Sequence, residues 1–505
     1  MASSRLLARW LARASDPRTL VHEASGPTSW SAAIETGDRV AGALLAGRRS
    51  LEGERVAMLV APGVDFAATF FGVLRAGGCV VVLSPLHPTP ETAYFCEDAG
   101  VRTIVTSPTL ADRVAVFAPA RRVVTTTTLC ASSPPSSGAL VADPGEQDAA
   151  LQLYTSGTTG KPKGAVITHA NLSVQQDLVA GAWEWTPDDV LLHALPLHHL
   201  HGLGIAWLTA IRAGAATHFL GGFDAKATWE AMPTATVFMG VPTVHARLLA
   251  ALDAADEVTR RRWIGGARAL RLITSGSAAL PVSIGERWRD LTGAYPLERF
   301  GMTEIGVGMS NPLAPGERRP GTVGRPLPSV QTRVVAEDGR EAAEGELWIA
   351  GPSVFAGYHE RPDATRDAFV NLDGQRWFKT GDTVTKAEDG YFRILGRTSV
   401  DILKSGGYKL SALEIEETLR EHAAIAEVAV VGVKDEAWGE RVVACVVPRA
   451  GREEECALEA LRAFAKERLA SYKVPKQVVI MRELPRNAVG KVVKPELLKI
   501  LALRT

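Results

Sequence analysis

Short runs of apolar residues alternate with amphipathic segments through the first 300 residues of the chain. Apolar positions three and four residues apart predict helices at 32–45, 65–76, 170–182 and 243–252. Unbroken Val, Ile and Leu runs predict buried strands at 55–60, 79–83, 103–106, 190–196, 235–240 and 269–276. Strands that are apolar on both faces, with helices between them, favour a parallel α/β sheet.

The pattern changes near residue 320, where short strands separated by turns are expected at 330–335, 345–350, 377–380 and 391–395. A further unit of helices and strands follows Gly396 and is large enough to fold alone. We therefore predict an α/β fold with two domains. Residues 1–396 form a large N-terminal domain of α/β subdomains plus a small β-rich subdomain, and residues 397–505 form a small α+β C-terminal domain.

The charge balance narrows the range of partners. The chain has 56 lysines and arginines against 56 acidic residues, so no basic surface for nucleic acid or an anionic membrane is indicated. The five cysteines form no CxxC pair, and no apolar run is long enough to span a membrane. We expect small-molecule partners, no nucleic acid and no membrane, and a cytoplasmic protein that is monomeric or weakly dimeric.

The first 13 residues carry three arginines and no acid, which is compatible with an organelle transit peptide. The alternative is a first amphipathic helix with Leu6, Leu7, Trp10 and Leu11 facing inward. Pro17 and the strand pattern that starts at Thr19 favour the helix.

The stretch from Tyr154 to Gly164 combines glycines, hydroxyl side chains and two lysines between two strand patterns. Glycine lets a backbone approach a ligand closely, and lysine supplies positive charge, so the composition indicates a polyphosphate-binding loop. A flexible linker is the plain alternative. The glycine spacing differs from the common nucleotide-triphosphate loop, because only two residues separate Gly157 from Gly160 and Pro162 follows Lys161.

Several ordered motifs resemble the adenylate-forming superfamily, which includes acyl-CoA synthetases, aryl-CoA ligases, adenylation domains and luciferases. The resemblance covers nearly the whole chain. It rests on 154–164, Leu297-Glu-Arg-Phe-Gly-Met-Thr-Glu304, 321–326, 345–347, 379–382, Gly396-Arg397 and 484–491. Each motif alone is weak, whereas all of them in this order are specific.

The resemblance implies a two-step reaction that uses ATP, Mg²⁺ and coenzyme A. A carboxylate attacks the α-phosphate to give an acyl-adenylate and pyrophosphate, and a thiol then attacks the acyl carbon and releases AMP. The implied catalytic residues are Lys491, Thr303, Glu304 and His199, with Glu304 as the metal ligand. The implied ATP-binding residues are Thr155, Ser156, Gly157, Thr158, Thr159, Lys163, Ser275, Gly276, Ser277, Glu298, Arg299, Phe300, Gly301, Met302, Thr303, Asp382 and Arg397.

Several of these residues have ordinary structural interpretations. Thr303 and Glu304 fit the cap and first turn of a helix, Asp382 fits a turn after Gly381, and Lys491 fits a solvated surface lysine. Membership of the ordered set favours the catalytic interpretation for all of them.

The resemblance also implies a mobile C-terminal domain that turns between the two half-reactions, one face carrying Lys491 and the other a coenzyme A loop. The implied loop residues are Lys404, Ser405, Gly406 and Gly407, for which a plain turn is the alternative. The hinge residue stays open, because Ser399 or Val400 lies where relatives carry Lys or Asp.

The acyl group is expected to contact Arg299, Arg247, His201 and Met302, with His199 as a gate. A guanidinium beside an acyl site needs an anion, and a second substrate carboxylate supplies one. The alternatives are an ion pair between Arg299 and Glu298, and a zinc site in the run of histidines at 198–201.

The amino-acid sequence at residues 297–312 and 396–416 is similar to that of malonyl-CoA and methylmalonyl-CoA synthetases. The hypothesis is therefore ATP-dependent ligation of malonate or methylmalonate to coenzyme A. The alternatives are a CoA ligase for another short, medium-chain or aryl acid, an adenylation enzyme that loads a carrier protein, and a non-catalytic nucleotide-binding relative.

Overall fold

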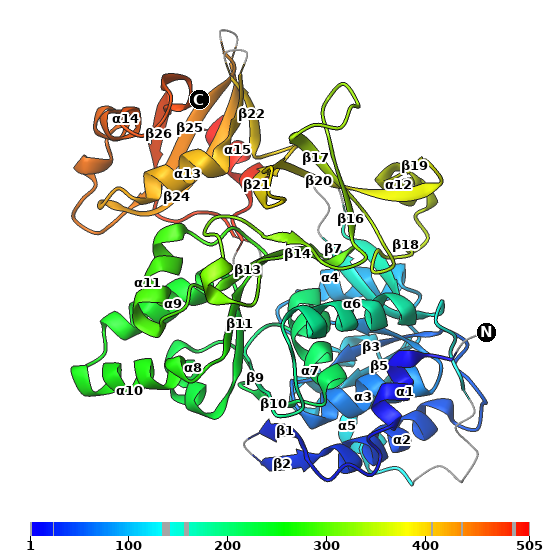
Figure 1. The fold of residues 1–505 in the computed structure, drawn as a ribbon. Helices are drawn as coiled ribbons and strands as arrows, with labels where there is room; N and C mark the ends of the chain where they lie inside the picture. Colours follow the sequence, from blue (N-terminus) through cyan, green and yellow to red (C-terminus); the bar gives the residue numbers. More distant parts are fainter. Residues whose placement is uncertain are drawn as a thin grey trace.

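The computed structural model describes residues 3–23, 25–133, 142–155, 161–405, 408–435, 438–486 and 491–503. In Figure 1 the C-terminal part of the chain lies above the larger N-terminal part, and a β-rich region lies beside it. None of the helices in these ranges is both long and apolar enough to cross a bilayer.

The first sheet carries the predicted phosphate loop at the end of one of its strands. Its order is β18 (Gly357–Tyr358), β8 (Lys163–Thr168), β7 (Ala149–Thr155), β4 (Cys79–Val82), β3 (Arg55–Leu59), β5 (Thr103–Thr106) and β6 (Arg122–Thr125). The strands from β7 to β6 pair in parallel, as predicted. β8 runs antiparallel to β7, which makes the sheet mixed. The seven residues between these two strands are too few for the crossover that a parallel neighbour needs, so β8 returns beside β7 as a hairpin.

The second sheet contains the strand that leads to Glu304. Its order is β15 (Arg325–Pro326), β14 (Gly306–Ser310), β13 (Leu297–Met302), β12 (Leu272–Ser275), β11 (Val237–Gly240), β9 (Val190–His193), β10 (Ala216–Phe219), β1 (Thr19–Glu23) and β2 (Gly26–Ser29). The strands from β13 to β1 are parallel, and the outer pairs are antiparallel. Parallel strands bring their carboxyl ends to one edge, which is where binding residues collect.

Helices connect the parallel strands and cover both sheets (Figure 1). In the first half they are α1 (Arg5–Leu11), α2 (Trp30–Leu45), α3 (Val64–Arg75), α4 (Thr89–Asp98), α5 (Thr126–Cys130) and α6 (His169–Ala182). The second half has a π-helical segment (His201–Trp207) that continues into α7 (Leu208–Ala213), and then α8 (Ala225–Ala231), α9 (Pro242–Asp253), α10 (Glu257–Arg268) and α11 (Val282–Thr292).

The N-terminal segment forms the amphipathic helix that the sequence favoured. Leu6, Leu7 and Trp10 of α1 are buried in the main core, and the Trp10 ring stacks on Phe71 with centroids 4.0 Å apart. Leu11 is only partly buried. Burial of two leucines and a tryptophan stabilises the fold by several kcal/mol, at roughly 2 kcal/mol for each large side chain.

The β-rich region forms a third sheet, in the order β16 (Gln331–Val335), β17 (Glu344–Ala350), β20 (Gln375–Lys386) and β19 (Phe369–Leu372). β21 (Phe392–Arg397) also pairs with β20, and α12 (Pro362–Ala368) precedes β19. β20 is longer than the predicted strand and carries Asp382, which pairs with Arg397 of β21.

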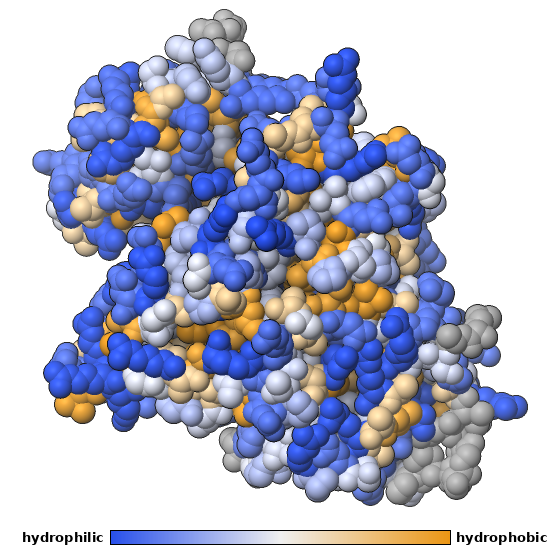
Figure 2. All heavy atoms as spheres, in the orientation of Figure 1, coloured by the Kyte–Doolittle hydropathy of each residue, from blue (hydrophilic) through white to orange (hydrophobic). Residues whose placement is uncertain are grey.

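The C-terminal part has its own sheet, in the order β23 (Tyr408–Ser411), β22 (Ile402–Ser405), β25 (Gly439–Pro448) and β24 (Ile425–Asp435), with β26 (Gln477–Ile480) also on β25. Its helices are α13 (Ala412–Arg420), α14 (Leu458–Lys466) and α15 (Lys494–Ala502). Two apolar clusters between residues 403 and 501 form separate cores here. Figure 2 shows that apolar residues reach the surface in areas across the middle of this face.

Candidate functional site

Glu304 lies in the tight turn between β13 and β14 and is only 5% exposed. No helix starts there, so the helix-cap interpretation of Thr303 and Glu304 is wrong; Thr303 itself is half-buried. The Tyr358 hydroxyl donates a hydrogen bond of 2.9 Å to Glu304 Oε1, and the Thr155 hydroxyl bonds the same carboxyl group. Burial raises the pKa of Glu304, and these bonds oppose the rise. A buried carboxylate that is bonded to Thr155, at one end of the predicted phosphate loop, suits a divalent cation.

Asp382, Arg397 and Lys491 converge beside Glu304. Arg397 Nε lies 3.2 Å from Asp382 Oδ1, and Arg397 also donates a bond of 2.6 Å to the Thr380 carbonyl. Burial raises the pKa of Asp382 to about 6, while Arg397 and Lys491 oppose the rise. Burial, and then Arg397, lower the pKa of Lys491, while Asp382 raises it. The C-terminal lysine therefore lies within electrostatic reach of the N-terminal cluster.

Lys163 and Thr155 flank the predicted phosphate loop and face each other across the β7–β8 pair. The Lys163 ammonium lies 5.2 Å from the centre of the Tyr358 ring, whose hydroxyl contacts Glu304. Both flanks of the loop therefore adjoin the metal-ligand candidate. Ser156, Gly157, Thr158 and Thr159 lie outside the described residues.

Arg299 is buried, with 4% of its surface exposed, on β13. Within the described ranges neither its Nε nor its Nη2 has a hydrogen-bond partner. Burial lowers the pKa of Arg299 to about 9, which measures how unfavourable the charge is there. The guanidinium lies against Gly276, where a Cβ would come within 2.5 Å of Arg299 Nε, so glycine is required. An uncompensated buried cation of this kind calls for an anionic ligand.

His201 joins this group, because its Nδ1 lies 3.2 Å from Ser277 Oγ. Ser277 adopts a left-handed backbone at φ 69°, a conformation that costs energy for a residue with a Cβ. Burial, and then the charge of Arg299, hold the pKa of His201 well below its usual value. His201 is therefore neutral at physiological pH and lies beside the guanidinium, as expected for a wall of an acyl pocket.

The neighbouring histidines form a separate stack. His199 is half-buried, and its ring centre lies 4.2 Å from that of His198, which in turn packs on His87. Burial lowers the pKa of His199 to about 4, with a smaller contribution from His87. Over the parts of the chain that the structure describes, no three His, Cys, Asp or Glu side chains are arranged to hold a metal ion. The zinc interpretation of the histidine run therefore fails for these residues.

The remaining predicted nucleotide residues lie on β12 and β13. Ser275 is buried at the end of β12, and its hydroxyl has no hydrogen-bond partner among the described residues. Phe300, Gly301 and Met302 are half-buried on β13, where the pairing with β14 shifts register after Phe300. The shift places these residues between the Arg299 group and Glu304.

Two predicted residues, Glu298 and Arg247, lie outside both the cluster around Glu304 and the group around Arg299. Glu298 precedes Arg299 on β13 and therefore points to the opposite face of the sheet, where the Gly321 amide donates a bond of 2.9 Å to it. This geometry excludes an ion pair between the Glu298 and Arg299 side chains, and the predicted role of Glu298 in ATP binding stays a prediction. Arg247 is exposed on α9, with its guanidinium 4.8 Å from the Phe223 ring centre, so it does not approach Arg299 as predicted.

Glu298 makes the stability of the protein dependent on pH. Burial raises its pKa from 4.5 to about 8, with a further contribution from Glu417. Between these values the folded state binds more protons than the unfolded state, so stability falls as pH rises. We expect Glu298→Gln to become more stable than the parent protein as pH rises from 5 to 8.5, by on the order of a few kcal/mol. Denaturant unfolding at several pH values measures this.

The control for this pH dependence is Glu337→Gln. Glu337 is exposed, and the pKa of its carboxyl is held low by Lys409 and Lys404, so its removal leaves the profile above pH 5 unchanged. Parallel profiles for Glu298→Gln and the parent protein would contradict the assignment.

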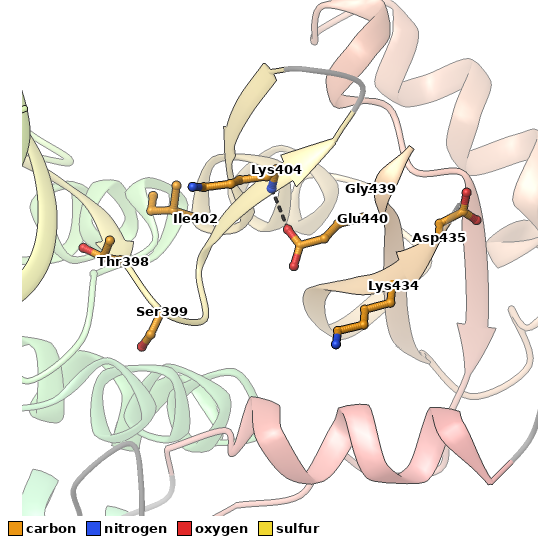
Figure 3. A pocket seen from close by; sticks show the side chains of 8 residues that line it. All are labelled: Thr398, Ser399, Ile402, Lys404, Lys434, Asp435, Gly439 and Glu440. Atoms are coloured by element: carbon orange, nitrogen blue, oxygen red, sulfur yellow. Dashed lines mark hydrogen bonds between the residues drawn. The ribbon is translucent and has the colours of Figure 1, made fainter. Parts of the chain in front are cut away.

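The predicted coenzyme A residues lie away from this site. Lys404 Nζ is 3.1 Å from Glu337 of the N-terminal part, and Ser405 is buried in β22. Figure 3 shows Lys404 beside a hollow of about 680 Å³ that is also lined by Ser399. The orientation of the C-terminal part therefore brings Lys491 to the ATP residues and leaves Lys404 on the opposite side. Gly406 and Gly407 lie outside the described residues.

The segment after Arg397 holds the C-terminal part in this orientation. Asp401 accepts a bond of 2.9 Å from the Arg397 amide and pairs with the buried Lys494. Lys494 also lies 2.7 Å from Glu416 of α13. Because Arg397 ends β21 and Asp401 contacts α15, only residues 398–400 are left to turn, which keeps both Ser399 and Val400 as hinge candidates.

Sequence reasoning missed Tyr358, which contacts both Glu304 and Lys163. It lies in β18, a strand of two residues that pairs with β8. A lone tyrosine after Gly357 carries no periodic signal, so only the fold shows its role.

Comparisons with known proteins agree with this geometry. Residues 7–359 match the family model of the AMP-binding enzymes, and residues 414–491 match that of the AMP-binding enzyme C-terminal domain. The chain belongs to the AMP-binding enzyme family. It is an AMP-forming ligase by this membership, with the large and small domains of that fold.

Several curated relatives have malonate in their names. The chain is 40% identical to the mouse malonate–CoA ligase ACSF3, mitochondrial, over 89% of this chain and 82% of the mouse protein. It is 39% identical to the malonate–CoA ligase of Arabidopsis thaliana, over 90% and 79% of the two chains. The crystal structure of ATP-bound MatB from Rhodopseudomonas palustris superposes with a TM-score of 0.88 at 34% identity, covering 99% of each chain.

Proposed function

We propose that this AMP-binding enzyme activates malonate as malonyl-adenylate and transfers the malonyl group to coenzyme A, releasing AMP and pyrophosphate. The observation that carries the substrate is Arg299, a buried guanidinium of which two nitrogens have no hydrogen-bond partner among the described residues. One carboxylate of malonate reacts, and the other pairs with Arg299 in the charge-assisted geometry that suits guanidinium. The malonate–CoA ligases among the relatives support the same acid.

In the first half-reaction a carboxylate oxygen forms a bond to the α-phosphorus, and the bond to the β-phosphate oxygen breaks. We assign Lys491 to the negative charge that the carboxylate and α-phosphate share, and Thr303 to the α-phosphate. Thr155 and Lys163 hold the leaving phosphates together with the loop between them, and Asp382 and Arg397 hold the ribose. Preformed cations and hydrogen-bond donors of this kind lower the barrier because they need no reorganisation.

Glu304 fits an Mg²⁺ ligand, because it is a buried oxygen donor whose raised pKa shows that a cation is favourable there. When bound, Mg²⁺ neutralises phosphate charge. A single protein carboxylate suffices, since Mg²⁺ is commonly held by one or two carboxylates and by substrate phosphates.

In the second half-reaction a thiol attacks the acyl carbon and AMP leaves. The C-terminal domain, which we place at residues 397–505, turns about residues 398–400 and exchanges Lys491 for the segment that carries Lys404 and Ser405. This assignment explains why these residues lie away from the cluster in the present orientation. The cytoplasmic location and the monomeric or weakly dimeric state stay predictions.

The first test is a panel of acids. Thioester formation from ATP, Mg²⁺ and coenzyme A is measured with malonate, methylmalonate, acetate, hexanoate and 4-coumarate. We expect kcat/KM for malonate or methylmalonate to exceed that for acetate by at least about 100-fold, the value of one charged hydrogen-bonded contact. Preference for a monocarboxylate would overturn the substrate. Transfer to a carrier-protein phosphopantetheine but not to free coenzyme A would instead identify a loading enzyme.

A further inference from the structure

Both flanks of the phosphate loop are attached to one helix, α4. The Tyr154 hydroxyl donates a bond of 2.9 Å to Asp98 Oδ2, at the end of this helix. The Tyr94 hydroxyl, one turn earlier, donates a bond of 2.7 Å to the carbonyl of Pro162 on the other flank. The Tyr154 ring also stacks on Phe95, with centroids 4.1 Å apart. Helix α4 therefore sets the positions from which the loop leaves and re-enters the sheet.

Asp98 is the centre of these contacts. Its side chain is 5% exposed and pairs with Arg361, and Tyr94 lies 3.4 Å from its other oxygen. The Arg361 guanidinium pairs with this carboxylate and compensates its burial, and hydrogen bonds to a carboxylate that is paired in this way are stronger than bonds between neutral groups. Burial, and then Asp98, raise the pKa of Tyr154 above its usual value, so its hydroxyl keeps the proton that it donates.

The same segment that supplies Arg361 reaches the metal-ligand candidate. The His359 amide donates a bond of 2.8 Å to the Gly164 carbonyl, directly after Lys163. Tyr358, the residue before it, donates to Glu304. One short segment, 358–361, therefore connects Asp98, the second flank of the loop and Glu304.

We propose that Asp98, acting through Tyr154, and Tyr94, through its own bond to Pro162, position the two flanks of the phosphate loop for the adenylating half-reaction. This proposal rests on the proposed function, because it assigns the loop to ATP. Asp98 is a positioning residue, not a catalytic one. Apolar contacts would also hold α4 against the sheet, but directed hydrogen bonds at both flanks fix where the chain leaves the sheet after Tyr154 and where it returns at Pro162. Displacement of a reacting group by about 1 Å costs up to roughly 100-fold in rate.

The test separates the two half-reactions. Asp98→Asn keeps the shape of the side chain and removes its charge, Tyr94→Phe removes only the bond to Pro162, and Tyr154→Phe keeps the stack on Phe95. We expect Asp98→Asn to raise the KM for ATP and to lower ATP–pyrophosphate exchange, each by about 10-fold, and each Tyr→Phe variant to change them by about 3-fold. Thioester formation from supplied malonyl-adenylate should stay within 2-fold, because pyrophosphate has already left.

Tyr391→Phe is the matched control. The Tyr391 hydroxyl donates a bond of 2.9 Å to the Glu317 carbonyl, and Tyr391 contacts none of the predicted site residues in the described ranges. It should leave both half-reactions unchanged. The melting temperatures of all variants show whether they fold. If Asp98→Asn does not fold, the two Tyr→Phe variants provide the test.

Equal losses in both half-reactions, or unchanged ATP–pyrophosphate exchange in Tyr94→Phe and Tyr154→Phe, would overturn the positioning role. Failure of the proposed function has a different signature. The parent protein would then show no malonate-dependent exchange, and the half-reaction split would be measured with whichever carboxylate of the panel supports exchange.

Discussion

Replacing Arg299 with methionine is expected to abolish most malonate activity while making the protein itself more stable. The guanidinium is 4% exposed and two of its nitrogens have no partner among the described residues, so in the absence of substrate the charge is uncompensated. Methionine has a similar length and no charge, so it removes the desolvation cost. We expect an increase in melting temperature of about 1 °C for each kcal/mol recovered, because the entropy of unfolding grows with the size of the domain. Thermal unfolding without ligands measures this.

The same variant should lose kcat/KM for malonate by about 10²–10³-fold, the cost of removing one partner of a buried charge pair. The KM for ATP should change less than about 3-fold, because the proposal pairs Arg299 with the acyl group and assigns the ribose to Asp382 and Arg397, which pair with each other. Activity with propionate or butyrate relative to malonate should rise.

Arg247→Met is the matched control, since it removes one arginine charge from an exposed position on α9. It should leave malonate activity within about 2-fold. If Arg247→Met lost as much activity as Arg299→Met, the sequence-based assignment of Arg247 to the acyl group would stand and the structural assignment would be wrong. Equal loss of ATP binding and malonate activity in Arg299→Met would identify a structural arginine.

Lys491→Ala should stop the first half-reaction and spare the second. Lys491 is the cation that the C-terminal domain contributes beside Asp382 and Arg397, and its pKa is lowered by burial and by Arg397. A donor directed at developing charge contributes about 10²–10³-fold, so malonate-dependent ATP–pyrophosphate exchange should fall by about 10³-fold. Thioester formation from supplied malonyl-adenylate and coenzyme A should stay within a few-fold.

Lys404→Ala is the reciprocal variant. Its ammonium pairs with Glu337 in this orientation, away from the adenylating cluster, so exchange should be unaffected. Thioester formation from the adenylate should fall if Lys404 meets coenzyme A after the domain turns. A Lys491→Ala protein that exchanges pyrophosphate at the full rate would contradict the mechanism and revive the non-catalytic alternative.

The sequence pattern by itself determined the layers of the fold and the candidate nucleotide residues. The alternating apolar segments predicted the α/β layers, and the ordered motifs predicted the ATP residues that converge on Glu304, including Asp382, Arg397 and Lys491. The fold prediction is confirmed because strand and helix periodicities are local. The roles of the motif residues stay predictions, which rest on the particular residue types that a nucleotide site needs at positions recorded by short motifs. The hydroxyl and lysine content of residues 154–164 indicated phosphate chemistry for the same reason.

Tertiary structure decided the rest. Glu298 and Arg299 are neighbours in sequence, yet strand geometry sends one to Gly321 and leaves the other unpaired beside Gly276. Arg247 was a plausible second cation until the rotation of α9 placed it on the surface. Tyr358, Asp98 and Tyr94 contact the site only because segments more than 50 residues apart in sequence pack together, as Tyr154 and Asp98 do across 56 residues. Contacts of this kind depend on packing in three dimensions, and local sequence does not encode them.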